Sequence, residues 1–492
     1  MGKMLELKSV LRRHATLDSL VGLLDWDHQV NLPPHSHELR TEQLAVTTEI
    51  AHREKTSDSY RRILDDVGED YDSLSEEDRL IFDHARKHFE KSKKIPNEFA
   101  ARKAEKQAQA YQKWVEAREA DDFDSFAPFL EEQIELCKEE AGYVGSHSDA
   151  YAYMIDQFDE GMDPETIDRL FGPMGEALQD LLSRCTCEEE GVFFSGLKFP
   201  AEKQEVFLQE VITKMGFDFN HGRLDRSVHP FCAGTGQDIR MTTRFFEDNP
   251  LDSLYSSIHE TGHALYEQGL PPEDWGNRLG THAGMAVHES QSRLWENQVA
   301  RSVEFWEFWE SRYRECFAEQ LSGISSKDWL NSVMIIKPIP IRVDSDEVTY
   351  NLHILIRYEL EKRLFAGDLM VKGLPAAWNS LYERLLGICP GSDAEGVLQD
   401  VHWSSGAFGY FPSYAVGNII SAQLWESLES SVQNVKDQIR SGEYASILKW
   451  LRERIHSVGA RYSAKDLVKE VTGKDLSEQP LVKYLDGKYG KG

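Results

Sequence analysis

Three side chains that could hold and use a metal ion stand close together in the segment SSIHETGHALYEQGL, residues 256–270. Apolar residues recur through this segment at helical spacing, which predicts an amphipathic helix. His259 and His263 are four residues apart, so both imidazoles lie on one face of that helix, one turn from each other. One tetrahedral metal ion can take a nitrogen from each, and Glu260 projects beside them as a candidate general base. The spacing therefore predicts a metal site that activates water.

The same predicted helix contains a glycine, Gly262, at an interior position where glycine is unfavourable. Interior glycine destabilises a helix by roughly 1 kcal/mol relative to alanine. We predict that its missing side chain lets another element approach the helix next to the site. The alternative for the histidines and the glutamate is two core imidazoles and one surface carboxylate.

A catalytic metal site also needs a third protein ligand and an open position for water. The metzincin pattern is excluded, because Tyr266 and Gly269 stand where its glycine and third histidine would be. The alternative is a carboxylate on a following helix, predicted over GMAVHESQSRLWENQVARS, residues 284–302. That helix offers Glu289 and Glu296, seven residues apart on one face, and spacing does not choose between them.

Composition narrows the class of protein. The 492 residues include 84 acidic and 55 basic side chains, for a formal net charge of -29. Such a surface repels nucleic acid and anionic membranes, so neither is an expected partner. The chain has no apolar run long enough to span a membrane, no signal-peptide pattern at its N-terminus and no cysteine framework. We therefore expect a soluble, cytoplasmic protein.

Helical periodicity dominates the chain. It predicts long amphipathic helices over residues 5–55 and 75–145, and it returns at Ser253 and continues almost to the C-terminus. Residues 186–250 differ, because β-branched and aromatic residues near-alternate between turn residues, which predicts short strands. Those strand segments are GVFFSGLKF (191–199), FDFNHGRLDRSVHPFCAG (217–234) and DIRMTTRFF (238–246). We expect one mainly α-helical domain over residues 1–492 with a small β-sheet.

Five further motifs follow in a fixed order: HPF (229–231), DIRMT (238–242), HESQ (288–291), IRVDSD (341–346) and GVLQDVHW (396–403). Together with HETGH (259–263), they make the chain resemble the carboxypeptidase Taq family of thermostable metallocarboxypeptidases. The resemblance extends from GLLDWDHQVNLPP (22–34) to the C-terminal helices. It implies an elongated helical domain with a deep central groove and a small sheet near the active site, similar in architecture to neurolysin and angiotensin-converting enzyme.

The resemblance also implies the chemistry. It makes His259, His263 and Glu289 the ligands of one divalent metal ion per chain, with zinc expected first and cobalt as the alternative, and Glu260 the general base. It implies peptide substrates, a homodimer, and release of single residues from peptide C-termini with broad side-chain tolerance.

The glycine-rich segment HWSSGAFGYFPSY, residues 402–414, can supply the donor that an oxyanion needs besides the metal. Related helical peptidases place a tyrosine from a comparable segment over the metal, and Tyr410 fits that pattern best. His402 is a further catalytic candidate. Tyr414 is the alternative donor and a candidate substrate-binding residue; simple packing is the competing interpretation for both tyrosines.

An exopeptidase must bind a terminal carboxylate, for which arginine is the natural two-pronged partner. The candidates are Arg342 and Arg240, and we favour Arg342. Arg240 and His229 are expected to shape the closed end of the groove. The alternative for either arginine is a structural ion pair with the nearby Asp346 or Asp238.

Two other functions remain open from the sequence. One is an endo-oligopeptidase or dipeptidyl carboxypeptidase on the same scaffold, which a comparison of free and amidated peptides would separate. The other is a non-catalytic helical scaffold that binds peptides in its groove. The intact HETGH segment and its supporting motifs argue against the second.

Overall fold

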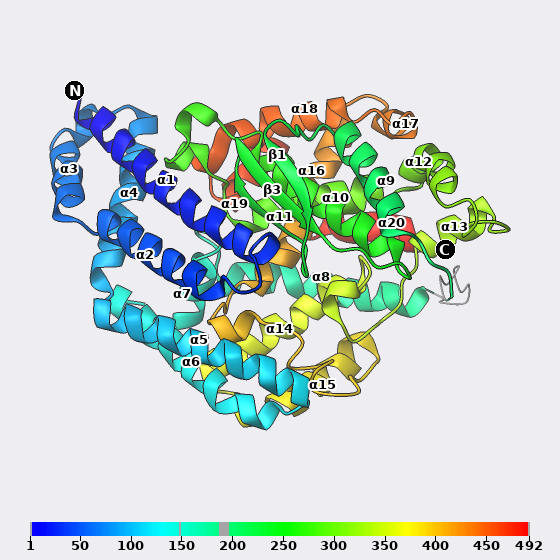
Figure 1. Cartoon of the computed structure of the whole chain (residues 1–492), viewed down its shortest axis with the longest axis horizontal. Coiled ribbons are helices and arrows are strands. Elements are labelled where there is room, and N and C mark those ends of the chain that lie inside the picture. The colour runs from blue at the N-terminus through cyan, green and yellow to red at the C-terminus, as the bar shows by residue number, and fades with distance from the viewer. Residues whose placement is uncertain (1, 147–148, 186–195, 491–492) are drawn as a thin grey trace.

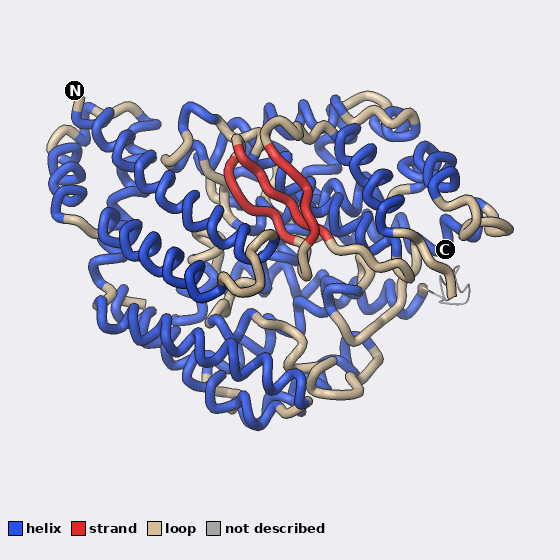
Figure 2. Tube along the Cα trace, viewed as in Figure 1, coloured by secondary structure: helices blue, strands red, loops and turns tan. Residues whose placement is uncertain are grey.

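A computed structural model of the chain describes residues 2–146, 149–185 and 196–490. Helices make up most of it (Figure 1), and a small sheet lies near the centre of the view with helices around it (Figure 2). The predicted mainly α-helical class is therefore confirmed. The predicted strand over residues 191–199 falls mostly outside the described residues, and the described part, 196–199, has no strand.

In Figure 1 the first α-helices occupy the left and the lower left of the molecule, except α8, which lies right of the centre. They are α1 (Lys3–Val30), α2 (His37–Lys55), α3 (Asp58–Gly68), α4 (Glu76–Lys94), α5 (Asn97–Ala120), α6 (Phe123–Val144), α7 (Ala150–Asp156) and α8 (Pro164–Arg184). A small apolar cluster joins α1, α3 and α4 through side chains such as Leu7, Leu64 and Phe82. A much larger cluster runs from α5 to the last helix and includes Ile258 and Leu265 of the helix that carries His259 and His263.

Most of the remaining α-helices lie above or to the right of the centre in Figure 1, whereas α14 and α15 lie below the sheet. The remaining α-helices are α9 (Ala201–Met215), α10 (Pro250–Glu267), α11 (Met285–Arg293), α12 (Val303–Cys316), α13 (Ser326–Val333), α14 (Thr349–Ala366), α15 (Leu374–Leu386), α16 (Phe411–Ser431), α17 (Val435–Arg440), α18 (Ala445–Arg454), α19 (Ala464–Thr472) and α20 (Gln479–Tyr489). The chain leaves α11 through a π-helix, η4 (Leu294–Ala300).

The sheet has strands β1 (Gly222–Arg226), β2 (Phe231–Thr235) and β3 (Asp238–Thr243) in the order β1-β3-β2. β3 pairs in parallel with β1 and antiparallel with β2. Ser257 of α10 donates a hydrogen bond to Thr243 of β3, and Arg240 on β3 lies over the Trp26 ring of α1. The sheet therefore connects α1 to the histidine helix, and the two strand segments predicted between residues 217 and 246 are confirmed.

A cavity of about 880 Å³ lies between the N-terminal helices and the end of α10. Its walls include His14 of α1, His84 of α4, the β2–β3 turn at Gly236, and Glu267 of α10. None of the predicted metal-binding, catalytic or substrate-binding residues lines this cavity, so it is distinct from the groove expected at the active site. Among the described residues, no helix combines the length and the apolar character that crossing a bilayer requires.

Candidate metal and catalytic site

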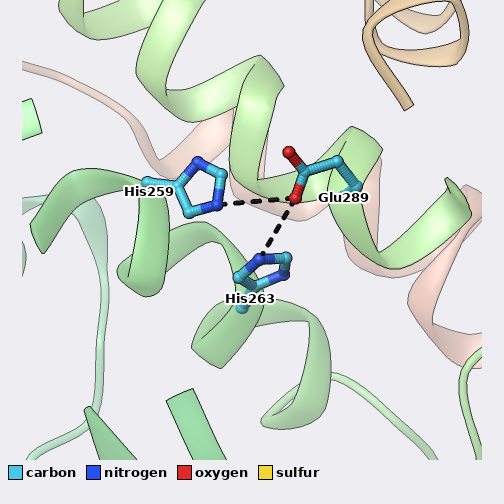
Figure 3. Close-up of side chains that lie close together, drawn as sticks. All are labelled: His259, His263 and Glu289. Atoms are coloured by element: carbon cyan, nitrogen blue, oxygen red, sulfur yellow. Dashed lines mark ion pairs between the residues drawn. The ribbon is translucent and has the colours of Figure 1, made fainter. Parts of the chain in front are cut away.

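The three expected metal ligands converge from two neighbouring helices (Figure 3). α10 contributes His259 and His263, and α11 contributes Glu289. Glu289 Oε2 lies 3.4 Å from Nε2 of His259 and 3.4 Å from Nε2 of His263. Ligand atoms about 2.0 Å from a tetrahedral metal ion are roughly 3.3 Å from each other. The spacing and the nitrogen and oxygen donors therefore fit a divalent metal ion.

Gly262 explains how α11 comes so close to α10. A Cβ atom at Gly262 would lie 2.5 Å from Ser292 Cα and 2.6 Å from the carbonyl oxygen of Gln291. The prediction that its missing side chain admits another element is therefore confirmed. On the opposite side of α11, a Cβ atom at Gly417 of α16 would lie 2.7 Å from Glu289 Cβ. Two glycines thus let α11 fit between α10 and α16.

The ring nitrogens that face away from the metal position are also bonded. Nδ1 of His259 lies 2.9 Å from Glu296 Oε2, and Nδ1 of His263 lies 2.6 Å from Nδ1 of His288. Nε2 of His288 in turn lies 3.0 Å from Glu267 Oε1. Such partners fix the orientation of a metal-binding imidazole. Of the two carboxylates that spacing left open, Glu289 is therefore next to the Nε2 atoms and Glu296 is behind His259.

Arg293 holds both carboxylates in place. Its Nε donates to Glu289 Oε1 at 2.7 Å, and its Nη1 donates to Glu296 Oε2 at 2.9 Å. Arg301 donates to the other oxygen of Glu296 at 3.0 Å. The π-helix η4 contains Glu296, and its wider turns change the direction of that side chain relative to a regular helix. Seven-residue spacing could not anticipate this.

Charge and burial prepare the site for a cation and a base. Burial raises the pKa of Glu260 to about 7, although His259 opposes the rise. Burial lowers the pKa of His259, but Glu289 and Glu296 outweigh it and the pKa is raised to about 10. The carboxylates thus attract positive charge to the position between the rings. A carboxylate with a pKa near 7 is well matched to proton transfer at neutral pH.

The glycine-rich segment brings a second group of side chains together. The rings of His402 and Tyr410 are stacked, with centroids 5.5 Å apart, and Tyr410 lies 5.1 Å from the Tyr414 ring. Nε2 of His402 is 3.3 Å from the Tyr414 hydroxyl. Burial raises the pKa of Tyr410 to about 12 and lowers that of His402 to about 4. Both are therefore neutral near pH 7, and the Tyr410 hydroxyl keeps its proton as a hydrogen-bond donor.

Arg342 is buried and bonded within the same group. Its Nε and Nη2 donate to one oxygen of Asp400 at 3.0 and 2.7 Å, and its Nη1 donates to the Tyr350 hydroxyl at 3.1 Å. Arg357 donates to the other Asp400 oxygen at 2.8 Å. Burial raises the pKa of Asp400, but the two guanidinium groups hold it far below its usual range. The guanidinium carbon of Arg342 lies 5.2 Å from the Tyr414 ring centre.

Of the two ion pairs that the sequence offered for the arginines, only one forms. Asp346 was the nearby ion-pair candidate for Arg342, and this is wrong. Asp346 instead accepts backbone hydrogen bonds at the start of α14, from Val348 and Thr349. The pair between Arg240 and Asp238 does form, with two hydrogen bonds of 3.0 and 3.1 Å.

His229 lies at the rim of the sheet. Its side chain is exposed, and its carbonyl accepts a hydrogen bond from Ser227 of the turn after β1. Burial, together with Arg244 and Arg118, lowers the pKa of its imidazole. Arg118 belongs to α5, so His229 faces charge from a helix far away in the sequence.

The sequence reasoning missed several residues of the site. Tyr350 connects the two groups, because its hydroxyl accepts from Arg342 and its ring lies 4.2 Å from the guanidinium carbon of Arg293. Asp400 could have been found, since it lies inside the GVLQDVHW motif. His288 could have been found in the same way, because it is the first residue of the HESQ motif, whereas no motif pointed to Tyr350 or Arg293.

Comparisons with known proteins agree with this geometry. A family model described as Carboxypeptidase Taq (M32) metallopeptidase matches residues 6–489. Carboxypeptidase 1 of Bacillus subtilis is 36% identical, covering 98% of this chain and 97% of that protein. Thermostable carboxypeptidase 1 of Thermus thermophilus is 38% identical, covering 97% of this chain and 96% of that protein. The crystal structure of the M32 carboxypeptidase from Deinococcus radiodurans has a TM-score of 0.96 and 37% identity, covering 100% of this chain and 99% of that one.

Proposed function

The chain belongs to the carboxypeptidase Taq (M32) family of metallopeptidases, and from that premise we propose that it releases single residues, with broad side-chain tolerance, from peptide C-termini. It is a metal-dependent carboxypeptidase and acts on peptides. The observation that carries the proposal is the convergence of His259, His263 and Glu289 next to the buried Glu260, with a buried arginine, Arg342, in the neighbouring group.

In this proposal, His259, His263 and Glu289 hold one divalent ion per chain, with zinc first and cobalt as the alternative. Two imidazoles and one carboxylate are a ligand set that zinc takes in catalytic sites. When bound, such an ion polarises the scissile carbonyl and lowers the pKa of a water molecule from 15.7 to about 7.

The side chains around that position complete the reaction. Glu260 accepts a proton from the attacking water and passes it to the leaving amine, a role that its burial next to His259 in the sequence supports. Tyr410 donates a hydrogen bond from its hydroxyl to the developing oxyanion, with Tyr414 as the alternative donor. His402 is neutral, and its contact with the Tyr414 hydroxyl orders the two rings.

Arg342 is our choice for the terminal carboxylate of the peptide. It lies with Tyr350 and Tyr414, and its bonds to Asp400 hold the guanidinium in one orientation. Arg240 is paired with Asp238 on the sheet, which supports a part in closing one end of the groove together with His229.

Mass spectrometry of a peptide mixture incubated with metal-loaded protein tests this function. We expect a ladder of products shortened one residue at a time from the C-terminus. Loss of residues in pairs would indicate a dipeptidyl carboxypeptidase, and internal cleavage would indicate an endo-oligopeptidase. Absence of any product from a metal-replete sample would favour the non-catalytic scaffold.

The carboxylate site is tested with one peptide in its free and its amidated form. Arg342→Ala should lower kcat/KM for the free peptide at least tenfold, because a hydrogen bond to a charged group contributes about 1.5–3 kcal/mol. The variant should also lose most of the preference for the free form. If that preference persists, Arg342 is structural and Arg240→Ala becomes the deciding variant.

The oligomeric state and the cellular location of the protein are also proposals. We propose that residues 1–492 act as one catalytic domain, in a homodimer, in the cytoplasm. The acidic composition and the family resemblance support them. Light scattering after size-exclusion chromatography would report the mass of the particle, and a monomer at micromolar concentration would contradict the dimer.

A further inference from the structure

The buried carboxylate of Glu361 has none of the roles assigned above. It lies on α14 and is fully buried. Its Oε1 accepts a hydrogen bond from Trp403 Nε1 at 2.6 Å, and its Oε2 accepts from the backbone N–H of Gly409 at 2.9 Å and from the Tyr151 hydroxyl at 2.8 Å. Burial raises the pKa of Glu361 to about 7, and these three donors oppose the rise. A buried carboxylate is tolerated only with such partners.

Two of the three donors are sequence neighbours of the catalytic candidates. Trp403 directly follows His402, and Gly409 directly precedes Tyr410. The Trp403 donor and the Gly409 donor bind different oxygens of Glu361. One carboxylate therefore ties both ends of the segment 402–410 to α14.

The middle of that segment is held by other helices. Gln107 of α5 donates to the carbonyl of Ser405 at 2.6 Å. Gly406 and Gly409 have positive φ angles of 71° and 77°, which favour glycine. A Cβ atom at Gly409 would also lie 2.7 Å from the backbone of Met154 in α7. The path of the segment is thus specific, and Glu361 bonds it at the two points next to the reactive side chains.

The orientation of Tyr410 depends on this path, because its ring stacks on His402 at the other end of the segment. A displacement of about 1 Å at a reacting group can lower a rate about 100-fold. We propose that Glu361 is a positioning residue that holds His402 and Tyr410 in the orientation that peptide hydrolysis requires. The inference rests on the proposed function, in particular on the role of Tyr410.

Glu361→Gln in the full-length, metal-loaded protein is the first test. A glutamine amide offers one oxygen, so it cannot accept from both Trp403 and Gly409. We expect kcat to fall at least tenfold, with KM and metal content near the wild-type values. Tyr151→Phe is the matched control, because it removes the third donor and leaves the segment's two bonds to Glu361 in place. Its kcat should stay within twofold of wild type.

The second test asks whether Glu361 acts through Tyr410. In a Tyr410→Phe background, Glu361→Gln should lower kcat less than twofold further, since residues that act as a unit are not additive. Equal losses in both backgrounds would overturn the inference, and so would a wild-type kcat for Glu361→Gln. If Glu361→Gln does not fold, Trp403→Phe removes the Nε1–H donor and keeps an aromatic ring, and the same outcomes apply to it.

Failure of the proposed function looks different in these measurements. It appears as wild-type protein that releases no C-terminal residues, or as Tyr410→Phe with full kcat. An active wild type, an impaired Tyr410→Phe and a fully active Glu361→Gln would overturn the positioning role of Glu361 alone.

Discussion

At the residue scale, each of the three proposed metal ligands has a partner that fixes which of its atoms faces the other two. Glu296 is hydrogen-bonded to Nδ1 of His259, and His288 is hydrogen-bonded to Nδ1 of His263. Arg293 donates a hydrogen bond to one oxygen of Glu289. The remaining Nε2 and carboxylate oxygen atoms point to a common position. These partners fix the orientation of the three side chains, as partners of metal-binding imidazoles do in known sites.

Removing the general base should separate chemistry from metal binding. Glu260→Gln keeps the three ligands and the shape of the side chain but cannot accept the water proton. We expect full metal occupancy and a kcat lowered about 10²- to 10⁴-fold, the usual contribution of a general base. Metal analysis and steady-state kinetics on one preparation measure both. Appreciable turnover in a metal-replete sample would refute this role.

Replacing Glu289 and replacing Glu296 should weaken metal binding to different extents. Glu289→Ala removes a ligand and should weaken metal binding most. Glu296→Ala leaves the ligands but frees the His259 ring, and loss of such a partner typically weakens metal affinity 10- to 100-fold. Spacing left the two carboxylates equivalent, and the contact of Glu296 with Nδ1 of His259 is what predicts the smaller loss for Glu296→Ala. Competition with a chromogenic chelator measures both affinities, and a larger loss in Glu296→Ala would reverse the assignment.

At the scale of elements, the site depends on how closely three helices pack. α11 lies between α10 and α16, and glycines at both contacts allow the approach. Small residues at a helix contact bring backbones together, and here that distance decides whether Glu289 reaches the two imidazoles. The cost of interior glycine in α10 is therefore offset by the metal site that it permits.

Gly262→Ala should test this packing. The added methyl group would meet the α11 backbone, so we expect a loss of about 1–3 kcal/mol in stability, as for other overpacked sites, together with weaker metal binding. Denaturant unfolding and a metal titration measure the two effects. Gly172→Ala in α8 is the control, because a Cβ atom there has no neighbour within 4 Å. It should leave metal binding unchanged. Wild-type metal affinity in Gly262→Ala would contradict the packing argument.

At the scale of the whole molecule, the site collects side chains from distant parts of the chain and is backed by the C-terminal helix. The Tyr484 hydroxyl of α20 donates to the carbonyl of Asn297 at 2.9 Å, next to Glu296. The Tyr489 hydroxyl donates to the buried Glu347 at 2.8 Å. Glu347 Oε2 also lies 2.9 Å from the Tyr484 hydroxyl oxygen, as a second acceptor for its single proton. The last helix thus packs on the π-helix behind the metal ligands.

Metal removal should consequently lower the stability of the whole protein. A ligand that binds only the folded state stabilises it by about 2.7 kcal/mol at 100 times its Kd. We expect a chelator to lower the apparent unfolding temperature and zinc to restore it. The unfolding temperature of His259→Ala should change with neither the chelator nor zinc. An unchanged unfolding temperature after metal analysis confirms removal would contradict this expectation.

The sequence by itself determined the helical class, the strand segments between residues 217 and 246, and the placing of His259 and His263 on one face of a helix. These follow from local periodicity and from the four-residue spacing of His259 and His263, which depends on one helix alone. The motifs singled out from the sequence also contained most residues of the second group, such as Arg342 and His402.

Only the tertiary structure distinguished Glu289 from Glu296, paired Arg342 with Asp400 instead of Asp346, and brought Glu361 to both ends of the glycine-rich segment. The physical reason is the same in each case. Local spacing reports which face of its own helix a side chain occupies, whereas its partner is decided by how helices distant in the sequence pack. A π-helix after α11 and two glycine contacts set that packing here, and neither follows from periodicity.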